Sequence, residues 1–397
     1  MSAYAAILRT PRVALLLAAT VFARLPIGIN HLAIVLFVRE VTGSYATAGV
    51  VVGAFALGSA AGAPFQGRLV DRLGRRVLVP LAAGHAAGLL CLWLLGHAGA
   101  PGAALAALAL AAGVVLPPTS SVLRALWPWL LRERPDLVPS AYAVDSVLIE
   151  LIFIAGPLGT AAVVALSGPE IALAASAASV AGGTVAFVLA LRDHPDEPAA
   201  GKPSLLGALA SPGIRTLVLG SVPLGFCLGV TEVAVPAFSD EHGAPELAGV
   251  LLAVWSAASA AGGLLYGARP RRAPLAALHQ RFAVLLPLGF LPLAVAGSPP
   301  AMALLLIPAG AFIAPLLATR NELVGFVAPP GYATEAFTWP LTALVSGAAA
   351  GAAVSGALAE GAGWQVAVVC GAAVAALGAL AVVQRRRTLA PAAASSL

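Results

Sequence analysis

The chain consists of long apolar runs separated by short polar intervals. A helix needs about 20 mostly apolar residues to cross the hydrocarbon core of a bilayer. Twelve runs meet this requirement, and they lie near residues 13–38, 45–66, 77–97, 102–124, 140–166, 170–191, 214–237, 246–267, 276–297, 300–320, 333–359 and 363–383. The pattern therefore predicts an all-α polytopic membrane protein with twelve transmembrane helices.

One polar interval is longer than the others and divides the runs into two sets of six. It includes the segment LRDHPDEPAAGKPS, residues 191–204, whose proline content is typical of a tether. We therefore expect an N-terminal six-helix bundle over residues 1–191, a cytoplasmic linker over 192–213, and a C-terminal six-helix bundle over 214–397. The last of these ends in a short basic tail.

Basic residues gather in alternate intervals between the runs. All of the 22 lysines and arginines except Arg24 and Arg39 fall in intervals on one side of the predicted membrane. Short cytoplasmic loops carry the excess of Lys and Arg, so we expect a protein of the cell membrane with both termini in the cytoplasm. This topology also accounts for the net charge of +5, and nucleic-acid binding is not expected.

The composition excludes a soluble protein and offers no catalytic motif. Charged residues make up 10% of the chain, whereas a soluble domain carries about 25%. The three cysteines lie inside apolar runs without the spacing of a metal or redox motif, and we expect them to pack as small apolar side chains. No H-E-x-x-H motif or phosphate-binding loop occurs. We therefore expect neither an enzyme nor a bound metal or cofactor.

The two halves of the chain resemble each other. Four segments match in the same order: residues 28–35 with 229–236, 48–67 with 248–267, 113–118 with 310–315, and 141–146 with 331–336. Parallel repeats of this kind form two bundles related by an axis along the membrane normal, with the substrate site near the midplane between them. The repeat predicts this arrangement here.

The interval between the second and third runs reads GRLVDRLGRRVL from Gly67 to Leu78. It resembles the G-x-L-x-D-x-x-G-R-[RK] signature of the major facilitator superfamily. The matching residues are Gly67, Leu69, Asp71, Gly74, Arg75 and Arg76. Gly67 allows close packing at a helix end, Gly74 allows a tight turn, and Asp71 can cap the start of the next helix or bind a basic residue. The resemblance implies a fold of two pseudo-symmetric six-helix bundles and a secondary transporter.

A second segment, GPLG, contains Gly156, Pro157 and Gly159 in the fifth run. It resembles part of the G-P-x-x-G motif of drug:proton antiporters, which implies efflux of drug-like molecules. Thr160 stands where that motif often has glycine, and the fourth run has no arginine at mid-membrane, because Arg124 is expected at its cytoplasmic end. The alternative is a packing kink, since proline removes a backbone hydrogen bond and small residues let helices approach.

Ionisable residues inside the runs are candidates for function, because each costs about 2.5–3.5 kcal/mol on insertion scales. Arg24 and Glu150 each lie about eleven residues into their helices, which corresponds to about 16 Å at 1.5 Å per residue. Helices 1 and 5 of the superfamily belong to the same bundle. We therefore predict an Arg24–Glu150 pair at the midplane, which either responds to protons or substrate or only fixes helix packing.

Further polar residues lie beyond this depth. Asn30 and His31 follow Arg24 by about two turns, and the repeat places Glu232 opposite His31. A His31–Glu232 contact across the two bundles would suit a proton-linked gate, since imidazole titrates near neutral pH. The alternative for His31 is a hydrogen bond to a nearby carbonyl. Trp339 is expected either to line the cavity or to pack in the core.

Asp145 and Glu335 are expected to begin helices 5 and 11 at matching repeat positions. Carboxylates are stabilised at helix N-termini, which by itself explains them. The functional alternative is a cytoplasmic lock in which Glu335 binds one of three arginines when the inner side is closed. These are Arg68, Arg72 and Arg75.

Together these features predict a proton-coupled exporter of a small, largely apolar compound that works by alternating access. A proton-coupled importer of a nutrient is the alternative, although the runs offer few fixed polar partners for one. A membrane sensor without transport activity is a more remote alternative, since every loop is short. We expect a small-molecule substrate, protons and the lipid bilayer as partners, and a functional monomer.

The topology can be tested with single cysteines in a variant that lacks the three native ones. A membrane-impermeant maleimide should label Arg72→Cys only from the cytoplasmic side, and Gly99→Cys, between the third and fourth runs, only from the outside. Labelling of Arg72→Cys from the outside in intact cells would show that the predicted orientation is wrong.

Overall fold

The computed structural model describes residues 6–7, 13–191, 206–244, 247–268 and 273–389. Its long helices are α2 (Val13–Thr42), α3 (Tyr45–Leu73), α4 (Leu78–His97), α5 (Gly102–Val114), α6 (Thr119–Leu130), α7 (Val138–Ser167), α8 (Pro169–Ala190), α9 (Pro212–Glu241), α10 (Leu247–Ala268), α11 (Leu275–Phe290), α12 (Pro299–Ala311), α13 (Ile313–Val327), α14 (Ala333–Ala362) and α15 (Trp364–Gln384). Within these ranges they form 12 segments long and apolar enough to cross a membrane. The prediction of an all-α protein with twelve spans is confirmed.

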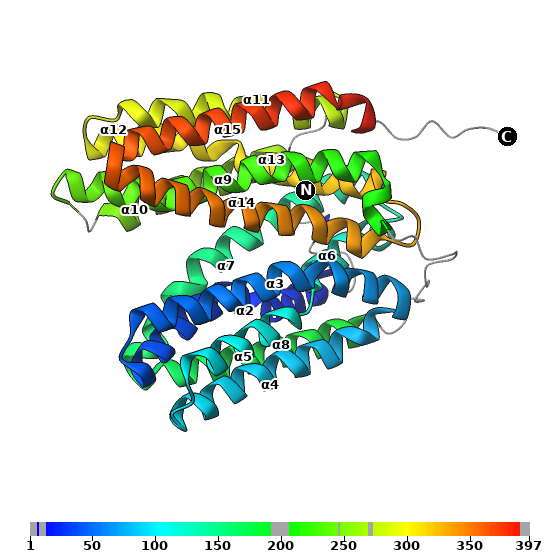
Figure 1. The fold of residues 1–397 in the computed structure, drawn as a ribbon. Coiled ribbons are helices and arrows are strands. Elements are labelled where there is room, and N and C mark those ends of the chain that lie inside the picture. The colour runs from blue at the N-terminus through cyan, green and yellow to red at the C-terminus, as the bar shows by residue number, and fades with distance from the viewer. Residues whose placement is uncertain (1–5, 8–12, 192–205, 245–246, 269–272, 390–397) are drawn as a thin grey trace.

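The helices form two groups, shown in Figure 1 with α2–α8 below and α9–α15 above. Within each group the first helix packs against the last ones, α2 against α8 and α9 against α14 and α15. The predicted linker lies largely outside the described residues, which resume with a short 3₁₀ helix, Gly207–Ala210, before α9. The predicted basic tail is described as far as residue 389.

Two spans are broken, which the apolar pattern did not predict. The fourth span divides into α5 and α6 around residues 115–118, and the tenth divides into α12 and α13 at Phe312. Both breaks fall within the matching repeat segments 113–118 and 310–315. In the first of them Pro117 and Pro118 supply no N–H and disfavour helical geometry in the preceding residue. The two halves therefore share this break in the helix as well as their sequence pattern.

The glycine-proline segment of α7 packs against α2 through its first glycine. A Cβ added to Gly156 would lie 2.6 Å from the Cα of Gly28, whereas one added to Gly159 meets nothing within 4 Å. Pro157 lies inside α7, which continues through it. The prediction that small residues here let two helices approach is thus confirmed for Gly156 and is wrong for Gly159, which lies on the exposed face of the helix.

This contact can be tested with a matched pair of substitutions. Gly156→Leu should lower the free energy of unfolding by about 1–3 kcal/mol or more, because the added side chain meets the α2 backbone. Gly159→Leu should leave it nearly unchanged, because its side chain enters open space. The measurement is the thermal unfolding midpoint of each purified variant in detergent. Equal midpoints for the two variants would contradict the close approach of α2 and α7.

Candidate functional site

The two halves meet at the end of the molecule where α3 ends and α14 begins, on the right of Figure 1. We call this the arginine-rich end, because Arg68, Arg72, Arg75 and Arg76 lie there. The same end carries the start of α7 and the last turn of α10, where the Ser140 hydroxyl donates a hydrogen bond to the Gly267 carbonyl at 2.6 Å. Two helix pairs, α3 with α14 and α7 with α10, thus close this end. The two pairs occupy related positions in the repeat.

Asp71 of α3 caps α14 of the other half. Its two carboxylate oxygens accept hydrogen bonds from the backbone N–H groups of Thr334 at 2.9 Å and Glu335 at 2.8 Å. The first N–H groups of a helix have no partner within it, and a negative charge beside them is favourable. Asp71 was expected to cap the next helix in the chain or to bind a basic residue. This is corrected: the helix that it caps belongs to the C-terminal half, so the contact joins the two halves.

Glu335 forms the predicted lock with Arg68. The guanidinium donates two parallel hydrogen bonds, from Nε to Oε2 and from Nη2 to Oε1, each 2.8 Å long, and the Glu335 side chain is fully buried. Trp339 donates from Nε1 to Oε1 at 3.2 Å, and the backbone N–H of Ala208 lies 3.3 Å from the same oxygen. Trp339, which was expected either to line the cavity or to pack in the core, packs against the hydrophobic core, and its polar atom orients the carboxylate of the lock.

The glycines of the loop signature allow this contact. A Cβ on Gly67 would lie 2.8 Å from the Cα of Glu335, so the absence of a side chain lets α3 and α14 touch. Gly74 ends α3 with φ at +81°, a conformation that glycine adopts at little cost. Arg75 is buried in the short 3₁₀ helix that follows, whereas Arg76 is exposed.

A second charge cluster lies inside the N-terminal half. Asp145 of α7 lies between Arg24 of α2 and Arg124 of α6, with Oδ1 2.6 Å from Arg24 Nη1 and Oδ2 2.5 Å from Arg124 Nε. All three side chains are at most 6% exposed. Two arginines and one aspartate leave this triad with a net positive charge. In the described part of the structure none of the three guanidinium nitrogens of Arg24 forms a hydrogen bond, so its contact with Asp145 is an ion pair only.

The triad corrects two expectations. Asp145 does not begin its helix, because α7 starts at Val138, about 10 Å nearer the arginine-rich end at 1.5 Å per residue. Arg124 does not end its helix, because α6 continues to Leu130. Arg24 pairs with Asp145, which was not the partner expected for it. The predicted Arg24–Glu150 pair stays a prediction, because the Glu150 side chain lies outside the described ones.

Asn30 and His31, the predicted cavity residues that follow Arg24 in α2, have different surroundings. Asn30 is fully buried, with Nδ2 3.1 Å from His85 Nε2, and its Oδ1 accepts a hydrogen bond from Ser176 Oγ at 2.5 Å. It therefore belongs to a network inside the N-terminal half and not to a cavity. The signal that could have found this network is the presence of single polar residues, His85 and Ser176, in otherwise apolar runs.

His31 and Glu232 are not brought together. Both side chains are exposed, and His31 meets Phe55 edge-on with ring centroids 5.6 Å apart. Among the described residues no hydrogen bond or ion pair joins the imidazole to Glu232. The contact expected across the two bundles is therefore not present in this conformation, in which the halves are joined at the arginine-rich end.

Comparisons with known proteins agree with this geometry. The family model described as Major Facilitator Superfamily matches residues 16–339. The chain is similar to the solved structure of the human organic anion transporter MFSD10 (TETRAN), with 19% identity, a TM-score of 0.68, and coverage of 95% of this chain and 98% of that one. It is also similar to a bacterial homologue of the iron transporter ferroportin in the outward-facing state, with 15% identity, a TM-score of 0.76, and coverage of 94% and 98%. At these identities the likeness shows the fold alone. No curated protein matches the chain.

The lock can be tested by its effect on closure. Hydrogen bonds to charged groups contribute about 1.5–3 kcal/mol, so Arg68→Gln or Asp71→Asn should raise the population open at this end about 10- to 100-fold. The measurement is the distance distribution between spin labels at Leu73 and Phe326, which are exposed on the two halves at this end.

Arg72→Gln is the matched control, because Arg72 lies exposed on the same turn of α3 and should leave the distribution as in the wild type. If Arg68→Gln gives the same distances as Arg72→Gln, the Arg68–Glu335 pair does not hold this end closed.

Proposed function

The chain belongs to the Major Facilitator Superfamily, and on that premise we propose that it exports a small, largely apolar compound across the cell membrane in exchange for protons. The family and the transporter structures that share its fold identify a multi-pass membrane transporter. Export, proton coupling and the class of substrate are our proposal.

Alternating access is supported by the nature of the contacts between the halves. Arg68, Asp71 and Ser140 make polar contacts between the halves at the arginine-rich end. Hydrogen bonds of this kind can exchange for bonds to water when the halves separate. Apolar side chains of both halves, such as Tyr142 and Phe337, also pack together there, so opening this end exposes apolar area as well. A site between the halves would then be exposed to one side of the membrane at a time.

The buried triad is the observation that carries proton coupling. Asp145 binds arginines from two other helices, so a proton on this carboxylate would weaken both ion pairs at once and free α2, α6 and α7 to move. Arginine cannot act as the proton carrier, because its pKa stays above about 12. Glu150 and Glu232 remain candidates for the same role, since both are carboxylates within spans. Asp145 is a third candidate proton carrier, because it lies inside the membrane-spanning helix α7 and not at its start.

The nature of the substrate follows from the charges in the spans. Within the described ranges the spans hold few ionisable groups, and the buried triad carries an excess positive charge. Such surroundings favour an apolar compound that is neutral or carries a negative group over a cation. Export is supported by the segment that contains Gly156 and Pro157, which resembles the motif of drug:proton antiporters.

The proposal is tested in proteoliposomes with an imposed pH gradient and two probes, radiolabelled chloramphenicol as a neutral compound and fluorescein as an anion. The wild type should concentrate at least one of them only with the gradient. Glu150→Gln, Glu232→Gln and Asp145→Asn should each reduce gradient-driven accumulation to background, while exchange without a gradient survives in Glu150→Gln or Glu232→Gln.

Glu133→Gln is the control, because Glu133 is exposed between two spans, and it should accumulate the probe like the wild type. Accumulation at wild-type levels in all three test variants would show a uniporter or coupling to another ion. Accumulation driven only by the opposite orientation of the gradient would show an importer.

A further inference from the structure

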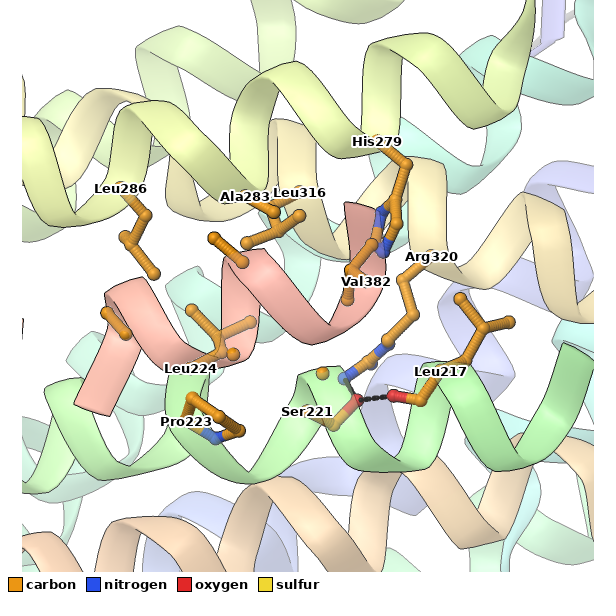
Figure 2. A pocket seen from close by; sticks show the side chains of 14 residues that line it. Leu217, Ser221, Pro223, Leu224, His279, Ala283, Leu286, Leu316, Arg320 and Val382 are labelled. Carbon is orange, nitrogen blue, oxygen red and sulfur yellow. Dashed lines mark hydrogen bonds between the residues drawn. The ribbon is translucent and has the colours of Figure 1, made fainter. Parts of the chain in front are cut away.

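A small cavity lies inside the C-terminal half, away from the contacts between the halves. Helices α9, α11, α13 and α15 line it, and its volume is about 20 Å³. Figure 2 shows three polar side chains, Ser221, His279 and Arg320, at one end of it, and apolar side chains such as Leu224 and Leu286 at the other. The cavity is thus charged at one end, apolar along the rest, and partly open to its surroundings.

Arg320 has only neutral partners. Its Nη1 lies 3.3 Å from Ser221 Oγ, and its Nε and Nη2 donate to Asn321 Oδ1 at 3.3 and 3.1 Å. The side chain is 4% exposed, and no carboxylate in the described ranges forms an ion pair with it. Arg24, Arg68 and Arg124 differ, because each of these binds an aspartate or glutamate. A buried charge without a counter-charge is unfavourable, so a negative partner would stabilise Arg320.

The position of the cavity indicates where that partner comes from. His279 lies four residues after the start of α11, and Arg320 lies seven residues before the end of α13, which places them about 6 and 10 Å from the arginine-rich end at 1.5 Å per residue. Arg215 and Arg385 are exposed nearby, at the start of α9 and the end of α15. Positive charge around a cavity raises the local concentration of anions.

The apolar end indicates the rest of the ligand. From Arg320 the cavity extends along α11 and α15, where Ala283, Leu286, Ala375 and Ala379 line it. A free inorganic anion would leave this surface without a partner, whereas the chain of an amphiphile would cover it and remove apolar area from water. The present volume corresponds to about one water molecule, so a larger head group must widen the charged end as it enters.

We propose that this cavity binds the oxyanion head, a phosphate or a carboxylate, of an amphiphile. The head group forms an ion pair with Arg320 and hydrogen bonds with Ser221 and His279, and the apolar remainder lies along α11 and α15. This site lies outside the interface between the two halves, so it is independent of the transported substrate. Its ligand is drawn from the bilayer or from solution, and the experiment distinguishes these sources.

The test uses the full-length protein in a neutral detergent and measures its thermal unfolding midpoint. The additives are dioleoyl phosphatidylglycerol, lauric acid, the neutral lipid monoolein and inorganic phosphate. Phosphatidylglycerol or laurate should raise the midpoint saturably, while monoolein and inorganic phosphate should not. In Arg320→Gln the apparent Kd for the anionic amphiphile should rise at least tenfold, whereas it should be unchanged in the control Arg132→Gln, because Arg132 is exposed in the N-terminal half.

A second variant keeps the test decisive if Arg320→Gln fails to fold. Ala283→Leu fills the cavity, leaves Arg320 in place, and should also abolish the response to the amphiphile. Stabilisation by inorganic phosphate as strong as that by phosphatidylglycerol would overturn the amphiphile in favour of a soluble anion. An equal response in the wild type and in Ala283→Leu would show binding to surface charge only, and no response in the wild type would show that the cavity takes no anion.

Discussion

Charges buried in a membrane protein have to find partners within the protein, because the bilayer core offers neither water nor counterions. This constraint explains the contacts that the buried charges make. Arg24 and Arg124 share Asp145, Arg68 pairs with Glu335, and Asp71 binds the unpaired N–H groups that begin α14. Each contact joins different helices, so the same interactions that satisfy charge also determine which helices lie side by side.

These contacts differ in how readily they can change. The triad lies inside one half and is shielded from water, so it holds α2, α6 and α7 together while Asp145 stays charged. The Arg68–Glu335 lock lies at the border, where Arg68 is 24% exposed, and water can replace its partners. A rigid half with a separable border is the arrangement that alternating access requires. Arg320, whose partners are neutral, is the exception that points to a ligand.

The sequence predicted the elements and the symmetry well, because both depend on local or repeated patterns. The apolar runs located the twelve spans, with ends that differ from the predicted ones by up to seven residues, but they did not predict the breaks within the fourth and tenth spans. The loop signature correctly indicated a close approach at Gly67, a turn at Gly74 and a capping role for Asp71. Glu335 was assigned to a lock because it and the arginines of the loop signature were both expected at the cytoplasmic border of the membrane.

The partners of the buried charges were decided by the tertiary structure. Hydropathy specifies that a helix crosses the membrane, but not how it is rotated about its axis or how its ends are staggered against its neighbours. The stagger of α7 placed Asp145 beside Arg24, and the rotation of α2 directed Asn30 into a network with His85 and left His31 exposed. The sequence by itself thus determined twelve spans, their duplication and the closing loop. Long-range packing decided which side chains meet, because contacts between helices depend on atoms far apart in the chain.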